Sequence, residues 1–336
     1  MPEGHTVHRL ATTFGRLFGE QDLAVSSPQG RFAAGAARLD GRVLVASEAW
    51  GKQMFLGFAE ARSSRENDDL RWLRVHLGLY GAWTFAGDPG ADVVHAIGAP
   101  RRRVSETDRT TTLDGVEASD GPWAPPAPRG QVRVRIASAH AVADLTGPTA
   151  CEVITGPERA TVLGRLGPDP LRDDADPEAF VAALTRSRSS VALQLMNQAV
   201  LAGVGNIYRA ESLFRARLAP ATPGTAVPRE TALDLWADLV GLMRDGARVG
   251  AIVTTRPEDR GAVPAAEGGA PTEPASRRRR RRTLQNTDGQ RDAVPSDEAF
   301  YVYHRDGLPC RVCGTTVARA DLGGRTLFWC PRCQSL

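Results

Sequence analysis

The sequence predicts a multidomain α+β protein, and three observations support this fold class. An amphipathic helical segment at the start is followed by segments in which apolar and polar residues alternate, the pattern of antiparallel strands with one buried face. After about residue 156 the apolar spacing becomes helical. Residues 300–336 contain two Cys-x-x-Cys pairs. We therefore predict an N-terminal antiparallel β-sandwich with a flanking helix, a central helical domain and a C-terminal β-hairpin finger.

Size and composition fit this division. A chain of 336 residues can form two domains and a small module. No apolar run reaches the roughly 20 residues that span a bilayer, and the first twenty residues lack the continuous apolar core of a signal peptide. Paired cysteines at this spacing suit metal binding in a reducing compartment better than disulfides. We expect a cytoplasmic, nucleoid-associated monomer that does not contact membranes.

The charge is distributed unevenly. Of 42 basic residues, all are arginine except Lys52. Removing the six charges of Arg277–Arg282 from the net charge of +3 leaves −3, so the fold is not basic throughout. Between Leu184 and Arg217 five arginines face a single acid, Glu211, which is a local charge of +4. This cluster indicates a nucleic-acid contact.

The N-terminal domain, residues 1–155, takes its first helix from residues 5–18, where apolar side chains recur at helical spacing. Four later segments predict strands: residues 42–46, 53–58, 71–77 and 131–136. Residues 61–70 and 86–129 are polar and predict loops.

The central domain, residues 156–255, carries helix signals. Asp176 can cap a helix whose first position is Pro177, and further helices are expected over residues 191–200, 207–216 and 230–248. Residues 256–299 are rich in proline, glycine and arginine and predict a disordered linker; the default for its arginine run is a solvated tail, with a DNA-tracking arm as the alternative.

The C-terminal module, residues 300–336, carries a four-cysteine site. Cys310, Cys313, Cys330 and Cys333 form two pairs separated by sixteen residues, the spacing of a structural zinc site with no open coordination position. We predict one structural Zn²⁺. Cys151 is left over and is expected to be a buried apolar thiol.

Two further segments suggest chemistry. Removal of Met1 would expose the secondary amine of Pro2, a nucleophile near neutral pH, with Glu3 beside it as an acid or base. By itself a Met-Pro start is more simply explained by chance. Residues 201–211 form a glycine-rich turn that leads into a helix, where Asn206 can cap the helix or donate to a phosphate.

Three segments in register resemble one family. Met1–Gly4, Leu201–Glu211 and the stretch from Gly324-Arg325 to Gln334 are similar to the formamidopyrimidine-DNA glycosylase/endonuclease VIII family of base-excision repair enzymes, and His5–Leu10 resembles its actinobacterial endonuclease VIII-like branch. The resemblance implies that the central domain is a helix–two-turn–helix DNA-binding domain.

The resemblance also implies roles for individual residues. Pro2 would attack the sugar C1′ of a damaged nucleotide and form an iminium. Glu3 would transfer protons, and the strand would be cut by β,δ-elimination. Lys52 would hold a phosphate beside the lesion. His76, Asn206 and Arg325 would contact DNA phosphates, and Leu79 and Tyr80 would fill the void left by the flipped nucleotide. From the sequence alone, Leu79 and Tyr80 could instead be a core pair at a strand end.

The sequence departs from the family at two places. His5 and Thr6 stand where many members carry a second carboxylate, and residues 144–149 lack the Arg–Phe pair that others insert opposite the lesion. We expect a bifunctional DNA glycosylase/AP lyase acting on oxidised bases, with pyrimidines favoured. The alternatives are a formamidopyrimidine or 8-oxoguanine enzyme, a lyase on abasic or single-stranded DNA, and a non-catalytic zinc-containing damaged-DNA-binding protein.

Overall fold

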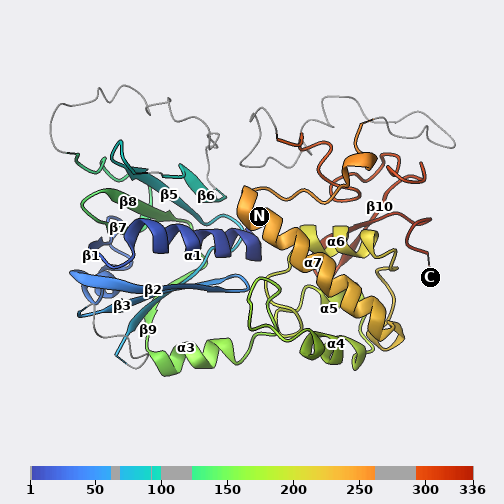
Figure 1. Cartoon of the computed structure of the whole chain (residues 1–336), viewed down its shortest axis with the longest axis horizontal. Coiled ribbons are helices and arrows are strands. Elements are labelled where there is room, and N and C mark those ends of the chain that lie inside the picture. The colour runs from blue at the N-terminus through green and yellow to red at the C-terminus, as the bar shows by residue number, and fades with distance from the viewer. Residues whose placement is uncertain (1, 62–68, 92, 100–122, 262–292, 336) are drawn as a thin grey trace. The chain divides into compact units, whose positions relative to one another are not determined.

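The computed structural model describes residues 2–61, 69–91, 93–99, 123–261 and 293–335. Residues 1–165 and 166–336 form two separate compact units, each with its own core (Figure 1). Within the described residues, no helix is both long and apolar enough to cross a membrane.

The described part of the first unit is built on helix α1 (Gly4–Phe18) and nine strands. Their pairings are all antiparallel, and the order is β6-β5-β8-β7-β1-β2-β3-β4-β9. Strand β1 pairs with both β2 and β7 and so joins two layers, with α1 between them (Figure 1). The strands are β1 (Asp22–Ser26), β2 (Arg42–Trp50), β3 (Gln53–Ala59), β4 (Arg71–His76), β5 (Ala82–Gly87), β6 (Ala96–Gly98), β7 (Val132–Ala137), β8 (Ala141–Thr146) and β9 (Ala150–Ile154); short helix α2 (Ala33–Ala37) follows β1, and α3 (Gly156–Leu163) follows β9.

The core of this unit lies between the layers. Phe14 of α1 is fully buried, and its ring meets the ring of Trp83 edge-on at 4.6 Å. Along β7, Val132, Val134 and Ile136 are buried and the two arginines between them are partly exposed, as the alternation predicts. The predicted first helix, the four predicted strands and the sandwich class are confirmed.

One predicted loop contains strand structure. Within residues 86–129, β5 continues to Gly87 and β6 pairs with it over Ala96–Gly98. A three-residue strand is too short to produce a recognisable alternation, so no sequence signal predicts it. Residues 100–122 of this predicted loop lie outside the described residues.

The second unit, where it is described, contains four α-helices and a hairpin: α4 (Pro177–Thr185), α5 (Val191–Gln194), α6 (Asn206–Arg215), α7 (Arg229–Val249), β10 (Ala318–Leu322) and β11 (Arg325–Trp329), with short 3-10 turns at Gly224–Ala226 and Pro257–Asp259. Asp176 caps α4 as predicted, because its carboxylate accepts from the Glu178 N–H at 2.9 Å. Helix α5 is shorter than the predicted 191–200. The Asn197 side chain accepts from the Ala199 N–H at 3.0 Å, a local bond that competes with helix continuation.

Both ends of the predicted linker are structured. The Thr254 N–H donates to the Ala299 carbonyl at 2.9 Å, and the Arg256 N–H donates to the Tyr301 hydroxyl at 3.0 Å. These bonds join the segment that leaves α7 to the one that enters the finger. Residues 262–292, including Arg277–Arg282, lie outside the described residues.

Candidate active site and metal centre

The amino end of α1 carries the two residues predicted to do the chemistry. Pro2 is buried and Glu3 is fully buried. Glu3 occupies the N-cap position, where its backbone carbonyl accepts from the Thr6 N–H at 3.0 Å, but its side chain makes no capping bond. The carboxylate therefore lies at the positive end of the helix dipole without serving as a cap.

His5 and Thr6, which follow Gly4, carry neutral side chains. His5 is 5% exposed, and its Nε2 lies 3.2 Å from the Thr6 hydroxyl. Burial first, and then the positive charges of the amino terminus, Arg9 and His8, lower the pKa of His5 to about 3. At neutral pH His5 is an uncharged imidazole.

Lys52 and His76 lie at the same end of the sheet. Residues Gly51 and Lys52 form the two-residue turn between β2 and β3, and Gly51 has a φ of 58°, as such turns require. Gln53 pairs with His76 across β3 and β4. Burial, with the charges of Lys52 and Arg74 as smaller causes, lowers the pKa of His76.

The tautomer of His76 follows from a backbone contact. The Gly78 N–H donates to His76 Nδ1 at 3.2 Å, so Nδ1 is an acceptor and the proton lies on Nε2. A neutral His76 can therefore still donate one hydrogen bond, from Nε2.

Leu79 and Tyr80 are exposed at the tip of the β4–β5 connection. Their exposed fractions are 37% and 78%, so they are not a core pair. Gly78 has a φ of 65° and packs closely against Thr149. A Cβ at this position would lie 1.8 Å from the Thr149 hydroxyl oxygen, so only glycine fits here. The Thr149 N–H donates to the His76 carbonyl at 2.9 Å, which ties the tip to the β8–β9 turn. Three residues, 147–149, make that turn.

In the second unit, Asn206 and the hairpin residue next to Arg325 are in contact. Asn206 opens α6 but does not cap it; Gly205 holds the N-cap position. The Asn206 amide Nδ2 donates to the Thr326 carbonyl at 2.9 Å, and Arg209 donates to Asn206 Oδ1. Asn206 is 7% exposed and Arg325 is exposed. Of the two roles that the sequence left open for Asn206, the cap is wrong, because its carboxamide binds the hairpin. The phosphate contact stays a prediction.

The arginine cluster expected between residues 184 and 217 does not form one surface. Arg209 is fully buried. Arg215 makes a bidentate pair with Asp238 and donates to the Thr254 carbonyl at 2.7 Å. Arg186, Arg188 and Arg217 are exposed. Helix packing directs Arg209 and Arg215 toward protein partners, and a count of charges along the sequence cannot reveal this.

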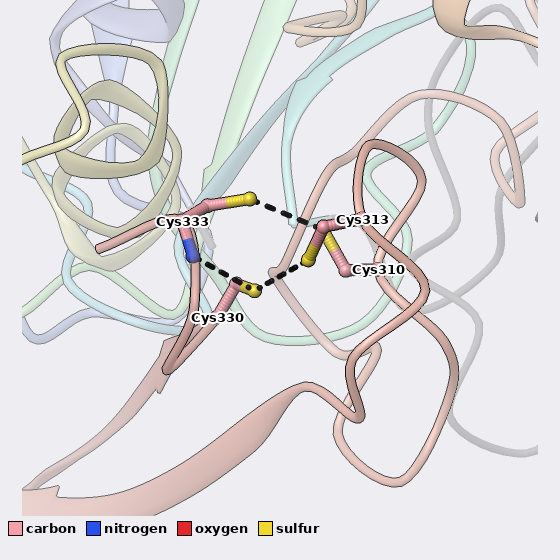
Figure 2. Close-up of side chains that lie close together, drawn as sticks. All are labelled: Cys310, Cys313, Cys330 and Cys333. Atoms are coloured by element: carbon pink, nitrogen blue, oxygen red, sulfur yellow. Dashed lines mark hydrogen bonds between the residues drawn. The ribbon is translucent and has the colours of Figure 1, made fainter. Parts of the chain in front are cut away.

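The four cysteines of the finger converge. Their Sγ atoms all lie within 4.8 Å of one another, with 3.9 Å between Cys310 and Cys333 and 3.5 Å between Cys313 and Cys330 (Figure 2). Four thiolates at the zinc–sulfur bond length around a tetrahedral ion would be about 3.8 Å apart. This donor set fits a structural metal site with no place for a substrate.

Sequence reasoning missed the role of Glu211. Its fully buried carboxylate accepts from the backbone N–H groups of Tyr301, Val302 and Tyr303 at 2.8, 2.8 and 2.7 Å and from the Thr254 hydroxyl. The residue therefore anchors the segment entering the finger to α6. An acid among arginines was visible in the sequence, but its partners, about ninety positions later, were not.

Sequence comparison decides the family. Endonuclease 8 1 of Mycobacterium tuberculosis (strain ATCC 25618 / H37Rv) is 39% identical over 335 residues, covering all of both chains. The chain belongs to the formamidopyrimidine-DNA glycosylase/endonuclease VIII family. The family profile described as "Formamidopyrimidine-DNA glycosylase H2TH domain" matches residues 166–257, and "Zinc finger found in FPG and IleRS" matches residues 307–336. The formamidopyrimidine-DNA glycosylase of Nitratidesulfovibrio vulgaris is 37% identical over half of this chain and 38% of its own.

Solved structures share the fold of this family. Lactococcus lactis Fpg (MutM) in complex with DNA containing N7-benzyl-Fapy-dG superposes with a TM-score of 0.66 at 18% identity over all of both chains. MutM of Thermus thermophilus gives a TM-score of 0.63 at 22% identity, covering 99% of this chain and 98% of that one. The predicted helix–two-turn–helix domain and zinc finger are confirmed as family features.

Proposed function

We propose that this protein is a bifunctional DNA glycosylase/AP lyase of base-excision repair that excises oxidised bases, pyrimidines before purines. The burial of Pro2 and Glu3 together at the amino end of α1, in a family member, is the observation that carries the proposal. A protein that only bound damaged DNA would need neither an amine nor a carboxylate at its amino terminus.

The proposed chemistry begins with removal of Met1. The Pro2 nitrogen attacks C1′ of the damaged nucleotide, a C1′–N bond to the enzyme forms, and the glycosidic bond breaks with its electron pair leaving on the base, which takes up a proton. Loss of the nitrogen proton and opening of the sugar ring give an iminium. Glu3 serves as the acid and base in these transfers. Removal of a C2′ proton then expels the 3′-phosphate, and a second elimination expels the 5′-phosphate.

Phosphate contacts are assigned to each unit separately. In the first, Lys52 supplies a point charge and His76 a neutral Nε2–H donor. In the second, Asn206 and Arg325 contact a phosphate at the amino end of α6. The exposed Leu79 and Tyr80 enter the stack when the nucleotide is flipped out. The finger that carries Arg325 is held by one structural Zn²⁺ at the four cysteines.

The substrate proposal rests on likeness to the endonuclease 8 relative. Activity on formamidopyrimidine or 8-oxoguanine is the alternative, since a relative named formamidopyrimidine-DNA glycosylase matches half of the chain. The protein is proposed to act as a monomer on duplex DNA, with abasic and single-stranded DNA as further substrates to test.

Borohydride trapping tests the proposal. The Met1-processed enzyme is incubated with oligonucleotides bearing an abasic site, an oxidised pyrimidine or 8-oxoguanine, and the reduced covalent adduct is measured. We expect adduct on the abasic site and the oxidised pyrimidine. No adduct on any of them would overturn the enzyme proposal, and adduct on the abasic site alone would leave a lyase.

The chain provides a matched control for the nucleophile. Once Met1 is removed, Lys52 holds the one primary amine, because every other basic side chain is arginine. Trapping should survive Lys52→Ala and disappear when Met1 is retained, because the Pro2 nitrogen is then part of a peptide bond and cannot attack. The reverse result would move the nucleophile to Lys52.

A further inference from the structure

Arg209 is a buried cation at the amino end of α6. Its side chain is fully shielded from solvent, although it lies one turn after Asn206, the proposed phosphate contact. A buried guanidinium is costly to desolvate, so its contacts indicate what it is held for. One of its amino groups, Nη2, donates to Asn206 Oδ1 and also to the Thr326 carbonyl, the latter at 3.2 Å.

These contacts close a triangle. Asn206 Nδ2 donates to the same Thr326 carbonyl at 2.9 Å, so Arg209, Asn206 and Thr326 are bonded pairwise. The three groups come from the helix start and from the finger strand β11, which lie in the same unit. The strand residue preceding Thr326 is Arg325, the other proposed phosphate contact.

The triangle fixes which way the Asn206 carboxamide faces. A carboxamide has an acceptor oxygen and a nitrogen with two donor hydrogens. Because Arg209 can only donate, it requires the oxygen on its side and leaves the nitrogen facing the finger. One nitrogen hydrogen is used by Thr326, and the second is the group available to a phosphate oxygen. A flipped carboxamide would present its oxygen to an anion, which is repulsive.

Thr326 links the position of the Arg325 backbone to the same contacts. Its carbonyl is held by two donors at the first turn of α6, so the start of β11 cannot move independently of that turn. Gly323 and Gly324, with φ values of 59° and 71°, make the hairpin tip, and Leu322 pairs with Arg325 across it. The position of the Arg325 backbone thus depends on contacts made by Arg209.

We propose that Arg209 is a positioning residue that aims Asn206 and Arg325 at one DNA phosphate. This inference rests on the proposed function of those two residues and assigns Arg209 no contact with the reacting atoms. Its positive charge, buried beneath the site, also favours the bound anion, because charges interact more strongly where water is excluded.

A double-mutant cycle tests the proposal on the full-length, zinc-loaded protein. The probe is a duplex with a tetrahydrofuran abasic analogue, and affinity is measured by fluorescence anisotropy across a range of salt concentrations. Arg209→Gln and Asn206→Ala should each weaken binding roughly 10-fold, and the double variant little more than either, because both changes break the same arrangement. Arg209→Gln should also lower the salt slope by about one phosphate contact.

Arg215→Gln is the matched control. Arg215 lies on the same helix and binds a carbonyl, but its partners are Asp238 and Thr254. We expect this variant to lower the melting temperature while it keeps the wild-type salt slope. A purely structural role for Arg209 would give the same pattern, with losses that multiply in the double variant, and that result would overturn the proposal.

The outcomes separate this inference from the function on which it rests. If Asn206→Ala and Arg325→Ala leave affinity unchanged, the phosphate site itself is wrong and the inference falls with it. If they weaken binding and Arg209→Gln does not, only the inference is wrong. If Arg209→Gln fails to retain zinc, Arg209→Lys replaces it in the cycle, because lysine keeps the positive charge. If Asn206→Ala then weakens binding as much in the Arg209→Lys background as in the wild type, the proposed bridging geometry is contradicted.

Discussion

Glu3 and Glu211 are both completely shielded from solvent, yet the fold places them in different settings. Glu211 lies in the middle of α6, where three backbone N–H groups and a hydroxyl donate to its two oxygens. Glu3 precedes the first turn of α1 beside Pro2, and its carboxylate does not cap the helix. The Glu211 carboxylate joins two segments of the fold, and the Glu3 carboxylate lies at a helix terminus next to the proposed nucleophile.

The two settings suit different roles, one in holding the fold together and one in proton transfer. A carboxylate that accepts several backbone hydrogen bonds holds the donating segment in place and contributes to stability. A general acid or base must lie beside the reacting atoms, so that it can exchange a proton with the substrate. Glu3 adjoins Pro2 in the chain, whereas the partners of Glu211 belong to the segment that enters the finger. Glu211 therefore attaches the segment that enters the finger, and Glu3 is the residue proposed for proton transfer.

The largest expected effect comes from changing each glutamate to glutamine. Glu3→Gln should lower base excision by about 10²–10⁴-fold, the usual contribution of a general acid or base. Glu211→Gln should destabilise the protein by roughly 2–4 kcal/mol, because an amide nitrogen would then face backbone donors. Single-turnover kinetics and urea unfolding measure the two effects. A Glu3→Gln variant that unfolds easily and keeps its excision rate would remove the distinction.

Loss of the metal tests the role of the finger that Glu211 anchors. Cys330→Ser removes one of four thiolates, and we expect loss of zinc together with a roughly 10–100-fold loss of affinity for abasic duplex DNA, since the finger folds with its ion. Metal content and anisotropy are measured on the same samples. DNA binding that persists at wild-type strength in a zinc-free variant would rule out the role assigned to the finger.

The pH dependence of stability tests the surroundings of Glu3. The pKa of His5 is lowered from 6.5 to about 3, so the unfolded chain binds more protons than the folded one between these values. The free energy of unfolding should therefore fall as pH drops below 6.5, by about 1.4 kcal/mol per pH unit, or roughly 2 kcal/mol from pH 7 to pH 5. Urea unfolding of wild type and His5→Gln at both pH values checks this. The variant should lose most of the slope, and an identical slope would show that His5 is not its source.

The smallest effect concerns the exposed tip. Tyr80→Ala and Leu79→Ala should each weaken binding to an abasic duplex about 5-fold and leave binding to single-stranded DNA unchanged, because the apolar side chains act only where a stack must be filled. Val249, 40% exposed at the end of α7, is the control. Equal losses for Leu79→Ala and Val249→Ala would mean that exposure alone explains the effect.

Local patterns in the sequence were sufficient for the elements. Apolar spacing predicted α1, α6 and α7, alternation predicted β7, and the cysteine spacing predicted the metal site, because each signal lies within a few residues along the chain. The prediction failed for the long form of α5, where the Asn197 side chain competes for the backbone, and for β6, which is too short to have a pattern.

The assignments of polar side chains needed the tertiary structure. The sequence placed Arg209 and Arg215 in a cluster that indicated a nucleic-acid contact, and it left Asn206 either as a helix cap or as a phosphate donor. Packing of α6 against β11 and α7 turned the two arginines toward protein partners, and the Asn206 carboxamide binds the Thr326 carbonyl of β11. The sequence also left Leu79 and Tyr80 open between core and surface, and the structure exposes both at the tip of the β4–β5 connection.

Residue type and spacing along the chain were therefore enough to predict the family, the order of the segments, the four clustered cysteines and the candidate nucleophile. Which charged groups hold the fold together could be read only from the folded chain. Charge and type are the same for Glu3 and Glu211, and what distinguishes them is the setting in which the fold places each carboxylate. Hydrogen-bond partners ninety residues apart leave no local pattern, so only the folded chain shows that Glu211 holds the segment entering the finger, which leaves Glu3 as the acid proposed for proton transfer.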